Sequence, residues 1–454
     1  MDTVALLRAL DERFALNRED AKVLIVGLGA TGFSVARFLR ELNIRFAIVD
    51  SRDKPPLIDR LATEMPDVPV FTGGFDKAAL EVATHLIVSP GISLHEKAIH
   101  KAAVTGVSII SDIDLFVSAI DRPILAITGS NGKSTVTTMV GAMGNAAAVK
   151  TAIGGNLGTP ALDLLAQNAD LYVLELSSFQ LERTCALNAK AATVLNISAD
   201  HLDRHIDINT YAEEKRQIFR GDGVMVLNAD DPLVMAMSDA DRVCLTFSIN
   251  GPADFWLDNE VGMLKQGEQD LMARADLPLE GRHNVANALA ALALGSAVGL
   301  NVAAMCKALK TFKGLAHRMQ KVAEIKGVSW VNDSKATNVG ACIAALQGYE
   351  HKVLLIAGGD AKGADMHDLV PVVKEKAKAV VLMGKDVPLI DQALANCVPV
   401  YFASTMKEAV RIAAGLAEPG DNVLLSPACA SLDQYKNYID RGEKFTAAVM
   451  ELAA

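Results

Sequence analysis

The chain lacks the features that mark secreted, membrane-spanning and nucleic-acid-binding proteins. Its six cysteines are scattered without C-x-x-C spacing, which indicates neither a disulfide framework nor a zinc site and fits a reducing cytoplasm. The longest apolar stretch, residues 288–300, contains two glycines and is too short for a membrane span, so it predicts a buried helix. A net charge of −10 argues against binding to nucleic acid or to an anionic membrane surface. The first residues carry charge too early for a signal peptide.

Apolar residues are plentiful instead, at 51% of the chain against 22% charged residues, which is typical of a well-packed globular protein. With 454 residues the chain is too long for a single hydrophobic core, and its length favours about three domains. Short apolar runs alternate with helix-like runs along most of the chain. This alternation predicts mostly parallel sheets that are covered by helices on both faces.

Residues 124–135 contain the most informative motif. A short apolar run, Ile124-Leu-Ala-Ile-Thr, leads into Gly129-Ser-Asn-Gly132-Lys-Ser-Thr135, and a helix-like stretch follows. A strand, a glycine loop and a helix start together hold phosphate through backbone N–H groups and the helix dipole. Lys133 can reach the β- and γ-phosphates, and the Ser134 hydroxyl can bind Mg²⁺. The full Walker pattern would have glycine at position 127, where this chain has isoleucine, so the loop is a compact variant. The motif predicts that the protein binds and cleaves ATP.

The first segment carries a second glycine motif. The strand-like run 21–26 precedes Gly27-Leu-Gly29-Ala-Thr-Gly32, and a second strand-like run ends at Asp50, close to the spacing of a ribose-binding acid. On these residues alone a dinucleotide is favoured, while another nucleotide diphosphate, or a tight turn that binds nothing, stays open. A further strand-like run ends in a turn at Gly91, which suits a loop at the carboxyl edge of a parallel sheet.

We expect three α/β domains. They are a Rossmann-like domain in residues 1–111, a central P-loop ATPase-type domain with a parallel sheet in residues 112–313, and a Rossmann-like doubly wound domain in residues 314–454. Within the central domain, residues 254–277 read as short strands and turns and predict a small β insertion. The apolar runs behind this division lie at 171–175, 191–197 and 223–228 in the central segment, and at 328–332, 352–359, 379–384 and 421–426 in the third.

Three side chains in the central segment are candidates for metal chemistry. Glu175 ends an apolar strand, where P-loop enzymes keep an acid for Mg²⁺. His201, in Asp200-His201, follows another strand and could bind a metal or a phosphate-bearing substrate, although a lone histidine is more often structural. Lys215 lies in the helical run 210–219, and from its neighbours alone it is interpreted as a solvated lysine.

The combined motifs resemble the Mur ligase family. The elements shared in the central segment are Thr128-Gly-Ser-Asn-Gly-Lys-Ser-Thr135, Glu175-Leu-Ser-Ser-Phe-Gln, Asp200-His201 and Gly281-Arg-His-Asn284-Val-Ala-Asn287. Three later motifs resemble the branch of that family that adds D-glutamate: Trp330-Val-Asn-Asp333-Ser-Lys335-Ala-Thr337, Gly358-Gly-Asp-Ala-Lys362-Gly-Ala-Asp and Leu425-Ser-Pro-Ala-Cys-Ala-Ser431-Leu-Asp-Gln-Tyr-Lys-Asn-Tyr438. The resemblance covers the chain from Ala21 onward.

The resemblance implies an ATP-dependent ligase of peptidoglycan precursor synthesis in the cytoplasm. Such an enzyme joins D-glutamate to UDP-N-acetylmuramoyl-L-alanine through an acyl phosphate, and it uses Mg²⁺ at two sites, where Mn²⁺ can replace it. The resemblance also implies that the first domain holds UDP rather than NAD. A monomer that neither spans a membrane nor binds nucleic acid is expected.

The resemblance also assigns residues to each site. The expected catalytic residues are Lys133, Glu175, His201 and Lys215. Ser134 and Glu175 would hold one Mg²⁺, and His201 and Lys215, carbamylated by CO₂, would hold the other. ATP contacts are expected at Gly129, Ser130, Asn131, Gly132, Lys133, Ser134, Thr135, Asn284, Asn287, Arg318 and Asp333. Contacts to the UDP substrate are expected at Ala30, Thr31, Asp50, Ser51, Arg52, Gly91 and Asn156. D-Glutamate contacts are expected at Lys335, Thr337, Lys362, Ser431 and Tyr438, the last in place of the family's phenylalanine.

Three other functions remain alternatives. Another Mur ligase or a folylpolyglutamate ligase would share the central motifs, but the Asp-Asn-Pro-Arg motif of a diaminopimelate-adding enzyme is absent from the last segment. An NAD-dependent oxidoreductase would explain the first glycine motif and leave the phosphate loop unexplained. A nucleotide-binding regulator would bind ATP without releasing phosphate in response to an acceptor acid.

Overall fold

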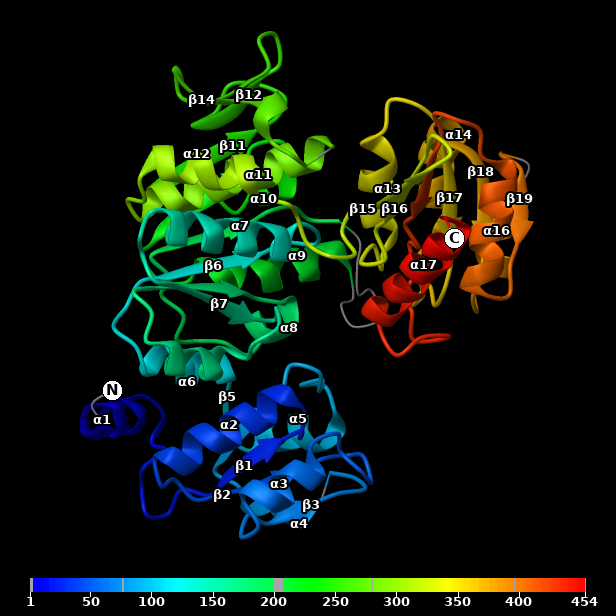
Figure 1. Cartoon of the computed structure of the whole chain (residues 1–454). Coiled ribbons are helices and arrows are strands. Elements are labelled where there is room, and N and C mark those ends of the chain that lie inside the picture. The colour runs from blue at the N-terminus through cyan, green and yellow to red at the C-terminus, as the bar shows by residue number, and fades with distance from the viewer. Residues whose placement is uncertain (1–2, 76, 199–206, 280, 396, 454) are drawn as a thin grey trace.

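The computed structural model describes residues 3–75, 77–198, 207–279, 281–395 and 397–453. In this part of the chain three sheets follow one another, with strands in residues 23–110, 124–273 and 320–425. Figure 1 shows the corresponding bodies, which we call the first, central and third domains, in blue, in cyan to green, and in yellow to red. The three-domain α/β architecture predicted from the sequence is therefore confirmed. The boundaries expected at 111/112 and 313/314 fall between the sheets.

The first domain is a five-stranded sheet in the order β3-β2-β1-β4-β5, and all the paired strands are parallel. The chain order reverses beside β1, so the loops that follow β1 and β4 meet at the carboxyl edge, where such sheets bind ligands. The strands are β1 (Val23–Val26), β2 (Phe46–Val49), β3 (Val70–Phe71), β4 (His85–Val88) and β5 (Ser108–Ile110), and the helices are α1 (Thr3–Phe14), α2 (Ala30–Glu41), α3 (Ile58–Glu64), α4 (Lys77–Val82) and α5 (Lys97–Val104).

The central domain is a nine-stranded sheet in the order β14-β13-β12-β11-β10-β9-β6-β8-β7. Its strands are β6 (Ile124–Thr128), β7 (Thr151–Gly155), β8 (Leu171–Glu175), β9 (Ala191–Val194), β10 (Val224–Asn228), β11 (Cys244–Ser248), β12 (Phe255–Asp258), β13 (Met263–Gln266) and β14 (Gln269–Ala273). Strands β12 to β14 correspond to the expected β insertion. They are not a separate unit, because β12 pairs in parallel with β11 and continues the main sheet.

Helices cover both faces of the central sheet (Figure 1). They are α6 (Asp112–Ser118), α7 (Lys133–Ala146), α8 (Ser178–Leu181), α9 (Ile208–Arg216), α10 (Pro232–Met235), α11 (Arg282–Ala297) and α12 (Val302–Thr311), with short 3₁₀ turns η1 (Ala161–Gln167), η2 (Gln217–Phe219) and η3 (Arg274–Asp276). Helices α7, α11 and α12 share one apolar cluster with one face of the sheet. Residues 288–295 of α11 are all buried, which confirms the buried helix predicted for the apolar run.

The first and central domains are joined by a continuous apolar core and by buried polar contacts. One cluster contains Leu10 of α1, Phe33 of α2 and Leu174 of β8. Arg183, whose side chain is fully buried, donates hydrogen bonds from the end of α8 to the carbonyls of Val88, Ser89 and Ile92 in the first domain. Apolar packing and buried hydrogen bonds therefore both hold the first domain against the central one.

The third domain is a six-stranded sheet in the order β15-β16-β20-β17-β18-β19, with its own core. Its elements are β15 (Gln320–Ile325), β16 (Val328–Asn332), β17 (Val353–Ala357), β18 (Ala377–Leu382), β19 (Val400–Phe402), β20 (Asn422–Leu425), η4 (Met366–Leu369), α13 (Val339–Gln347), α14 (Val370–Lys376), α15 (Val387–Leu394), α16 (Met406–Leu416) and α17 (Tyr438–Ala453). The four predicted strands form its centre. The edge strands β15, which is antiparallel, and β19 are partly exposed.

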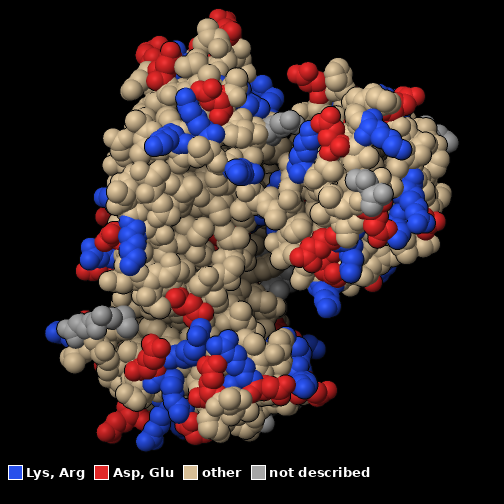
Figure 2. All heavy atoms as spheres, in the orientation of Figure 1, with Lys and Arg blue, Asp and Glu red and all other residues tan. Residues whose placement is uncertain are grey.

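Space-filling spheres show a hollow between the central and third domains on the face drawn in Figure 2. None of the described helices is both long and apolar enough to cross a membrane.

Candidate active site

The phosphate loop between β6 and α7 requires its glycines. Gly129 and Gly132 have φ values of +148° and +83°, which other residues rarely adopt. A Cβ on Gly132 would collide with the Asn287 side-chain oxygen, and one on Gly129 would lie 3.0 Å from Leu195 Cβ. The loop also rests on the segment after β9, because the Asn131 N–H donates to Asn196 Oδ1 at 2.8 Å and Ser130 Oγ donates to the Ser198 carbonyl at 3.0 Å. The result is a rigid concave backbone at a helix start, which fits a phosphate group.

Lys133, the first residue of α7, folds back over this loop. Its Nζ donates to the carbonyls of Gly129 at 2.7 Å and Ser130 at 2.8 Å. These contacts place an ammonium group beside the N-terminal end of α7, where the helix dipole also attracts negative charge. The loop is therefore suited to several phosphate oxygens at once.

Three polar side chains surround the buried carboxylate of Glu175 at the end of β8. Ser134 Oγ donates to Glu175 Oε2 at 2.5 Å, and Asn156 Nδ2 donates to Oε1 at 2.6 Å. Arg318, from the third domain, donates through Nη2 to Ser134 Oγ at 2.7 Å. Hydroxyl and carboxylate oxygens are the ligands that Mg²⁺ prefers, so Ser134 and Glu175 fit a magnesium site. Asn156, which was expected at the sugar nucleotide, contacts Glu175 in this structure.

Lys215 lies beneath the phosphate loop and is only 1% exposed. Its Nζ donates to Thr128 Oγ1 at 3.3 Å and lies 4.4 Å from the centre of the Tyr211 ring. The interpretation of Lys215 as a solvated lysine is therefore wrong. Helix α9 turns the side chains of Tyr211 and Lys215 toward the central sheet, and both are buried. A buried ammonium is costly, so a lysine at this position needs a chemical reason.

Only one of the two residues expected at the second metal site belongs to the described part of the chain. His201 lies outside the described residues, together with Asp200. Among the residues that are described, no group of three or more His, Cys, Asp or Glu side chains could hold a metal ion. Lys215 is the described member of that expected site.

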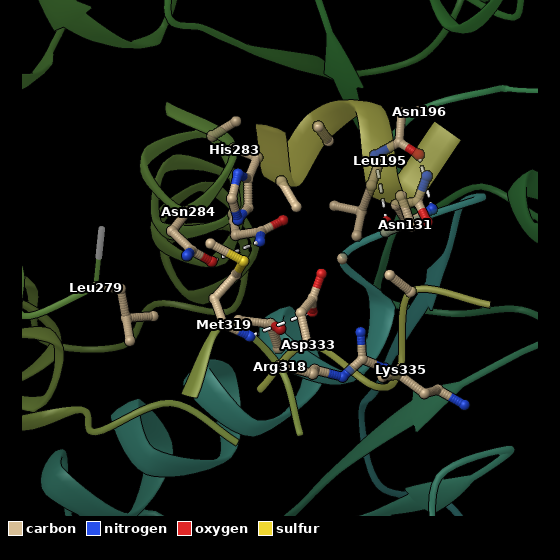
Figure 3. A pocket seen from close by; sticks show the side chains of 18 of the residues that line it. Asn131, Leu195, Asn196, Leu279, His283, Asn284, Arg318, Met319, Asp333 and Lys335 are labelled. Atoms are coloured by element: carbon tan, nitrogen blue, oxygen red, sulfur yellow. Dashed lines mark hydrogen bonds between the residues drawn. The ribbon is translucent and has the colours of Figure 1, made fainter. Parts of the chain in front are cut away.

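A cavity of about 340 Å³ lies between the central and third domains. Figure 3 shows His283 and Asn284 on one side of it and Arg318 and Asp333 on the other. The expected ATP residues that line the cavity are Asn131, Gly132, Thr135, Asn284, Asn287, Arg318 and Asp333. Lys335 lines it as well. The structure thus brings seven expected ATP residues from two domains around one space.

Several lining residues were not singled out from the sequence. They are Leu195, Asn196, Asn228, Phe247, Leu279, His283, Met319 and, on α13, Ala341, Ala344 and Ala345. Burial lowers the pKa of His283 to about 4, so its ring is neutral and offers a flat wall. Small and flat apolar surfaces suit a planar base. Only His283 had a sequence signal, because it lies inside the motif Gly281-Arg-His-Asn284.

Two charged residues of the third domain face this cavity. Burial raises the pKa of Asp333 to about 7, although Ser426 Oγ and the Met319 N–H donate to its carboxylate at 3.0 and 3.2 Å. Burial also lowers the pKa of Arg318 from its ordinary value. A carboxyl group with a pKa near 7 is partly protonated at neutral pH, so it can either donate a hydrogen bond to a polar ligand or accept one from it.

The expected D-glutamate residues lie on loops at one edge of the third sheet. Parallel strands β16, β20 and β17 are neighbours, so the loops that follow them meet at their carboxyl ends. Lys335 and Thr337 follow β16, Lys362 follows β17, and Ser431 and Tyr438 follow β20. Lys335 Nζ lies 4.0 Å from the centre of the Tyr438 ring. Burial, and next the charge of Arg318, lower the pKa of Lys335 to about 8.

In the first domain, Asp50 is buried and organises the turn after β1. Its carboxylate accepts hydrogen bonds from the Leu28 N–H at 2.7 Å and from the Arg52 side chain at 2.8 and 2.6 Å. Burial opposes its ionisation, but the hydrogen bonds from Arg52 and Leu28 prevail and lower the pKa of Asp50. The other expected UDP contacts are wholly or partly exposed around this turn and after β4: Ala30, Thr31, Ser51, Arg52 and Gly91.

Family models match three parts of this chain. The Mur ligase MurD-like N-terminal domain matches residues 21–111, the Mur ligase middle domain matches residues 127–295, and the Mur ligase glutamate ligase domain matches residues 317–429. The first match includes the whole of the first glycine motif, Gly27 to Gly32.

Individual relatives and solved structures agree with these matches. The chain is 55% identical over 438 residues to a UDP-N-acetylmuramoylalanine–D-glutamate ligase from Methylococcus capsulatus, covering 95% of each chain. It is 51% identical over 442 residues to the protein of that name from Pseudomonas aeruginosa, covering 95% of this chain and 98% of the relative. Its fold is similar to that of a UDP-N-acetylmuramate-alanine ligase from Thermotoga maritima, with a TM-score of 0.61 at 18% identity over 95% of this chain and 99% of that one.

Proposed function

The chain belongs to the Mur ligase family and is an ATP-dependent ligase, and on this basis we propose that it joins D-glutamate to UDP-N-acetylmuramoyl-L-alanine. The observation that supports this assignment most strongly is a single cleft. Residues of the phosphate loop line it from the central domain, and Arg318, Asp333 and Lys335 line it from the third domain. Arg318 also donates to Ser134, which is paired with Glu175. The product is a precursor of peptidoglycan, and the reaction takes place in the cytoplasm on a monomeric enzyme.

The reaction has to overcome the low reactivity of a carboxylate. The acceptor's carboxylate oxygen attacks the γ-phosphorus of ATP, the bond to the bridging oxygen breaks, and ADP leaves. The resulting acyl phosphate has a good leaving group. The amino group of D-glutamate, after losing a proton, attacks the carbonyl carbon. The C–O bond to phosphate then breaks, and its electron pair leaves with the phosphate. The products are the amide, ADP and inorganic phosphate.

The central domain holds the triphosphate and its charge. Backbone N–H groups at the start of α7, in residues 132–135, contact the phosphates. Lys133 turns from the carbonyls of Gly129 and Ser130 to the phosphate oxygens. Ser134 and Glu175 hold one Mg²⁺, which neutralises charge on the β- and γ-phosphates when it is bound. Thr135, Asn284, Asn287 and Asp333 surround the adenosine, and Arg318 leaves Ser134 for a phosphate oxygen.

Lys215, together with His201, would hold the second Mg²⁺, which would supply positive charge for the acceptor carboxylate. The addition of CO₂ converts the lysine amine into a carbamate, which is an anionic oxygen ligand. The burial of Lys215 and its position 3.3 Å from Thr128 Oγ1 support this proposal, because they hold the lysine away from solvent beside the residue that leads into the phosphate loop. Mg²⁺ at this site would face the acceptor carboxylate, and Mn²⁺ would serve in its place.

The other two substrates lie on either side of the phosphate loop. The first domain holds the uridine diphosphate group through Ala30, Thr31, Asp50, Ser51, Arg52 and Gly91, and Asn156 reaches the sugar from beside Glu175. The third domain holds D-glutamate between Lys335 and Lys362, whose positive charges face its two carboxylates. Thr337, Ser431 and Tyr438 complete the site.

The assignment is tested by phosphate release from Mg²⁺-ATP and UDP-N-acetylmuramoyl-L-alanine with D-glutamate, L-glutamate or diaminopimelate as the third substrate. We expect release with D-glutamate alone. Release with another amino acid would keep the ligase chemistry and overturn the roles of Lys335, Lys362 and Ser431. An enzyme that binds ATP but releases no phosphate with any of the three would be a regulator instead.

A further inference from the structure

A buried arginine on the last helix joins the loops that carry the expected D-glutamate residues. Arg441, on α17, is 2% exposed. Its Nε donates to Ser334 Oγ at 3.0 Å, and its Nη2 donates to the Ser334 carbonyl at 2.8 Å. Both Nη atoms donate to the Cys429 carbonyl at 3.1 Å, and Nη1 also donates to the Ala430 carbonyl at 3.3 Å. All three guanidinium nitrogens therefore make hydrogen bonds to two loops.

Two of these acceptor residues are next to a residue of the expected D-glutamate site. Ser334 directly precedes Lys335, and Ala430 directly precedes Ser431. Ser334 also donates through Oγ to the carbonyl of Tyr438, at the start of the helix that carries Arg441. The guanidinium is therefore one residue in the chain from two of the five expected contacts and one further hydrogen bond from a third.

The loop after β17 is connected to the same arrangement. Asp360 and Ala430 form an isolated antiparallel bridge, with N–O distances of 3.0 and 2.8 Å. Lys362 lies two residues later, with a left-handed φ of +49°, and its N–H donates to Asp360 Oδ1 at 3.0 Å. A non-glycine residue keeps this conformation only where its surroundings fix it. The bridge thus extends the influence of Arg441 to the second lysine of the site.

The chemistry of the guanidinium suits this role. Arginine presents five N–H donors in a planar fork, whereas the three donors of lysine lie on one nitrogen and cannot reproduce this set of contacts. Removal of the fork would leave the buried carbonyls of Ser334 and Cys429 without this donor, which favours a rearrangement of both loops.

We propose that Arg441 is a positioning residue for D-glutamate: it fixes the loops after β16 and β20 so that Lys335, Lys362 and Ser431 converge on the amino acid. It touches neither substrate nor ATP. This proposal rests on the function proposed above and assigns to α17 a part in recognition of the amino acid.

The test compares Arg441→Lys and Arg441→Met with Lys444→Met, an exposed lysine on the same helix. Steady-state phosphate release gives KM for each of the three substrates. We expect Arg441→Lys to raise KM for D-glutamate about 10–100-fold, the range for removing a residue that orients a ligand-binding group. KM for ATP and for the UDP substrate should change less than about twofold, and Lys444→Met should behave as wild type.

A second variant covers the case in which Arg441→Met fails to fold. Ser334→Ala removes one acceptor of the guanidinium and the link to Tyr438, and it should raise KM for D-glutamate with the other two constants unchanged. Formation of the acyl phosphate without D-glutamate, trapped by borohydride reduction, should stay at the wild-type rate in Arg441→Lys and Ser334→Ala. If Arg441 only stabilised the fold, its replacement would also lower the rate of acyl-phosphate formation.

The outcomes separate the two proposals. If the wild-type enzyme shows no D-glutamate-dependent phosphate release, the proposed function fails and the role of Arg441 falls with it. If the wild type is active and Arg441→Lys keeps its KM for D-glutamate, only the role of Arg441 is overturned. Equal changes in all three KM values would also overturn it.

Discussion

Lys215 is the residue whose replacement is most informative about the metal chemistry. It is buried beneath the phosphate loop with Thr128 and Tyr211 as neighbours. We expect Lys215→Ala to lower kcat at least about 10–100-fold, because a group that orients a metal is lost. Bicarbonate will not restore this variant, but a short carboxylate such as acetate should restore part of the rate by occupying the space of the carbamate. Lys190→Ala, an exposed lysine of the same domain, is the control.

The expected role of Lys335 predicts that kcat/KM for D-glutamate depends on pH. Burial and the charge of Arg318 lower its pKa to about 8, so its ammonium form is lost as the pH rises through that value. We expect kcat/KM for D-glutamate to fall above about pH 8 relative to that of Lys335→Arg, whose guanidinium stays charged. The ratio of kcat/KM between the wild type and Lys335→Arg cancels the pH dependence that comes from the amino group of D-glutamate itself. A constant ratio between pH 7 and pH 9.5 would contradict this role.

The residue scale also shows where sequence reasoning ends. The pairing of Ser134 with Glu175 could be anticipated, because both follow neighbouring strands of a phosphate-loop sheet. The burial of Lys215 could not be anticipated from its neighbours, since its sequence, Glu-Glu-Lys-Arg, is that of a solvated helix face. Only the packing of α9 against distant residues of the sheet makes that face an interior one.

At the scale of elements, the turn from β6 to α7 is the most constrained. Gly132→Ala should raise the Kd of an ATP analogue at least about tenfold, because its Cβ would displace Asn287 in addition to straining the left-handed backbone. Gly267→Ala is the matched control, since Gly267 is also left-handed, at φ +54°, but a Cβ there meets nothing within 4 Å. Both variants should lose about 1 kcal/mol of stability from strain. Equal nucleotide affinity in the two would contradict the constraint.

Most of the central strands were predictable, whereas β11, inside the central sheet, and most of the edge strands were not. Strands such as β6, β8 and β17 are fully buried and therefore appear as continuous apolar runs. The edge strands β15 and β19 are mostly exposed or half-buried and have no such run. Strands β12 to β14 alternate as an antiparallel meander, so their residues indicated strands but not their continuity with the main sheet.

At the scale of the whole molecule, Arg183 locks the first domain to the central one. Arg183→Met would remove the side-chain donor from the carbonyls of Val88 and Ile92 and one of the two donors to the Ser89 carbonyl. We expect a loss of about 2–3 kcal/mol in the free energy of unfolding, measured in urea. Arg216→Met, with a half-exposed side chain on α9, should change it by less than about 0.5 kcal/mol. Similar losses in both variants would show that the contact is not a strong one.

The hydrogen bond from Arg318 to Ser134 makes the third domain a competitor of the metal. The serine cannot serve both the guanidinium and Mg²⁺ in the same geometry, so nucleotide entry and the placement of the third domain are linked equilibria. Linkage is reciprocal: if the metal nucleotide shifts the third domain toward its amino-acid-binding position, the amino acid must strengthen nucleotide binding by the same factor. One interdomain contact thus couples the affinity for the metal nucleotide to the affinity for the amino acid.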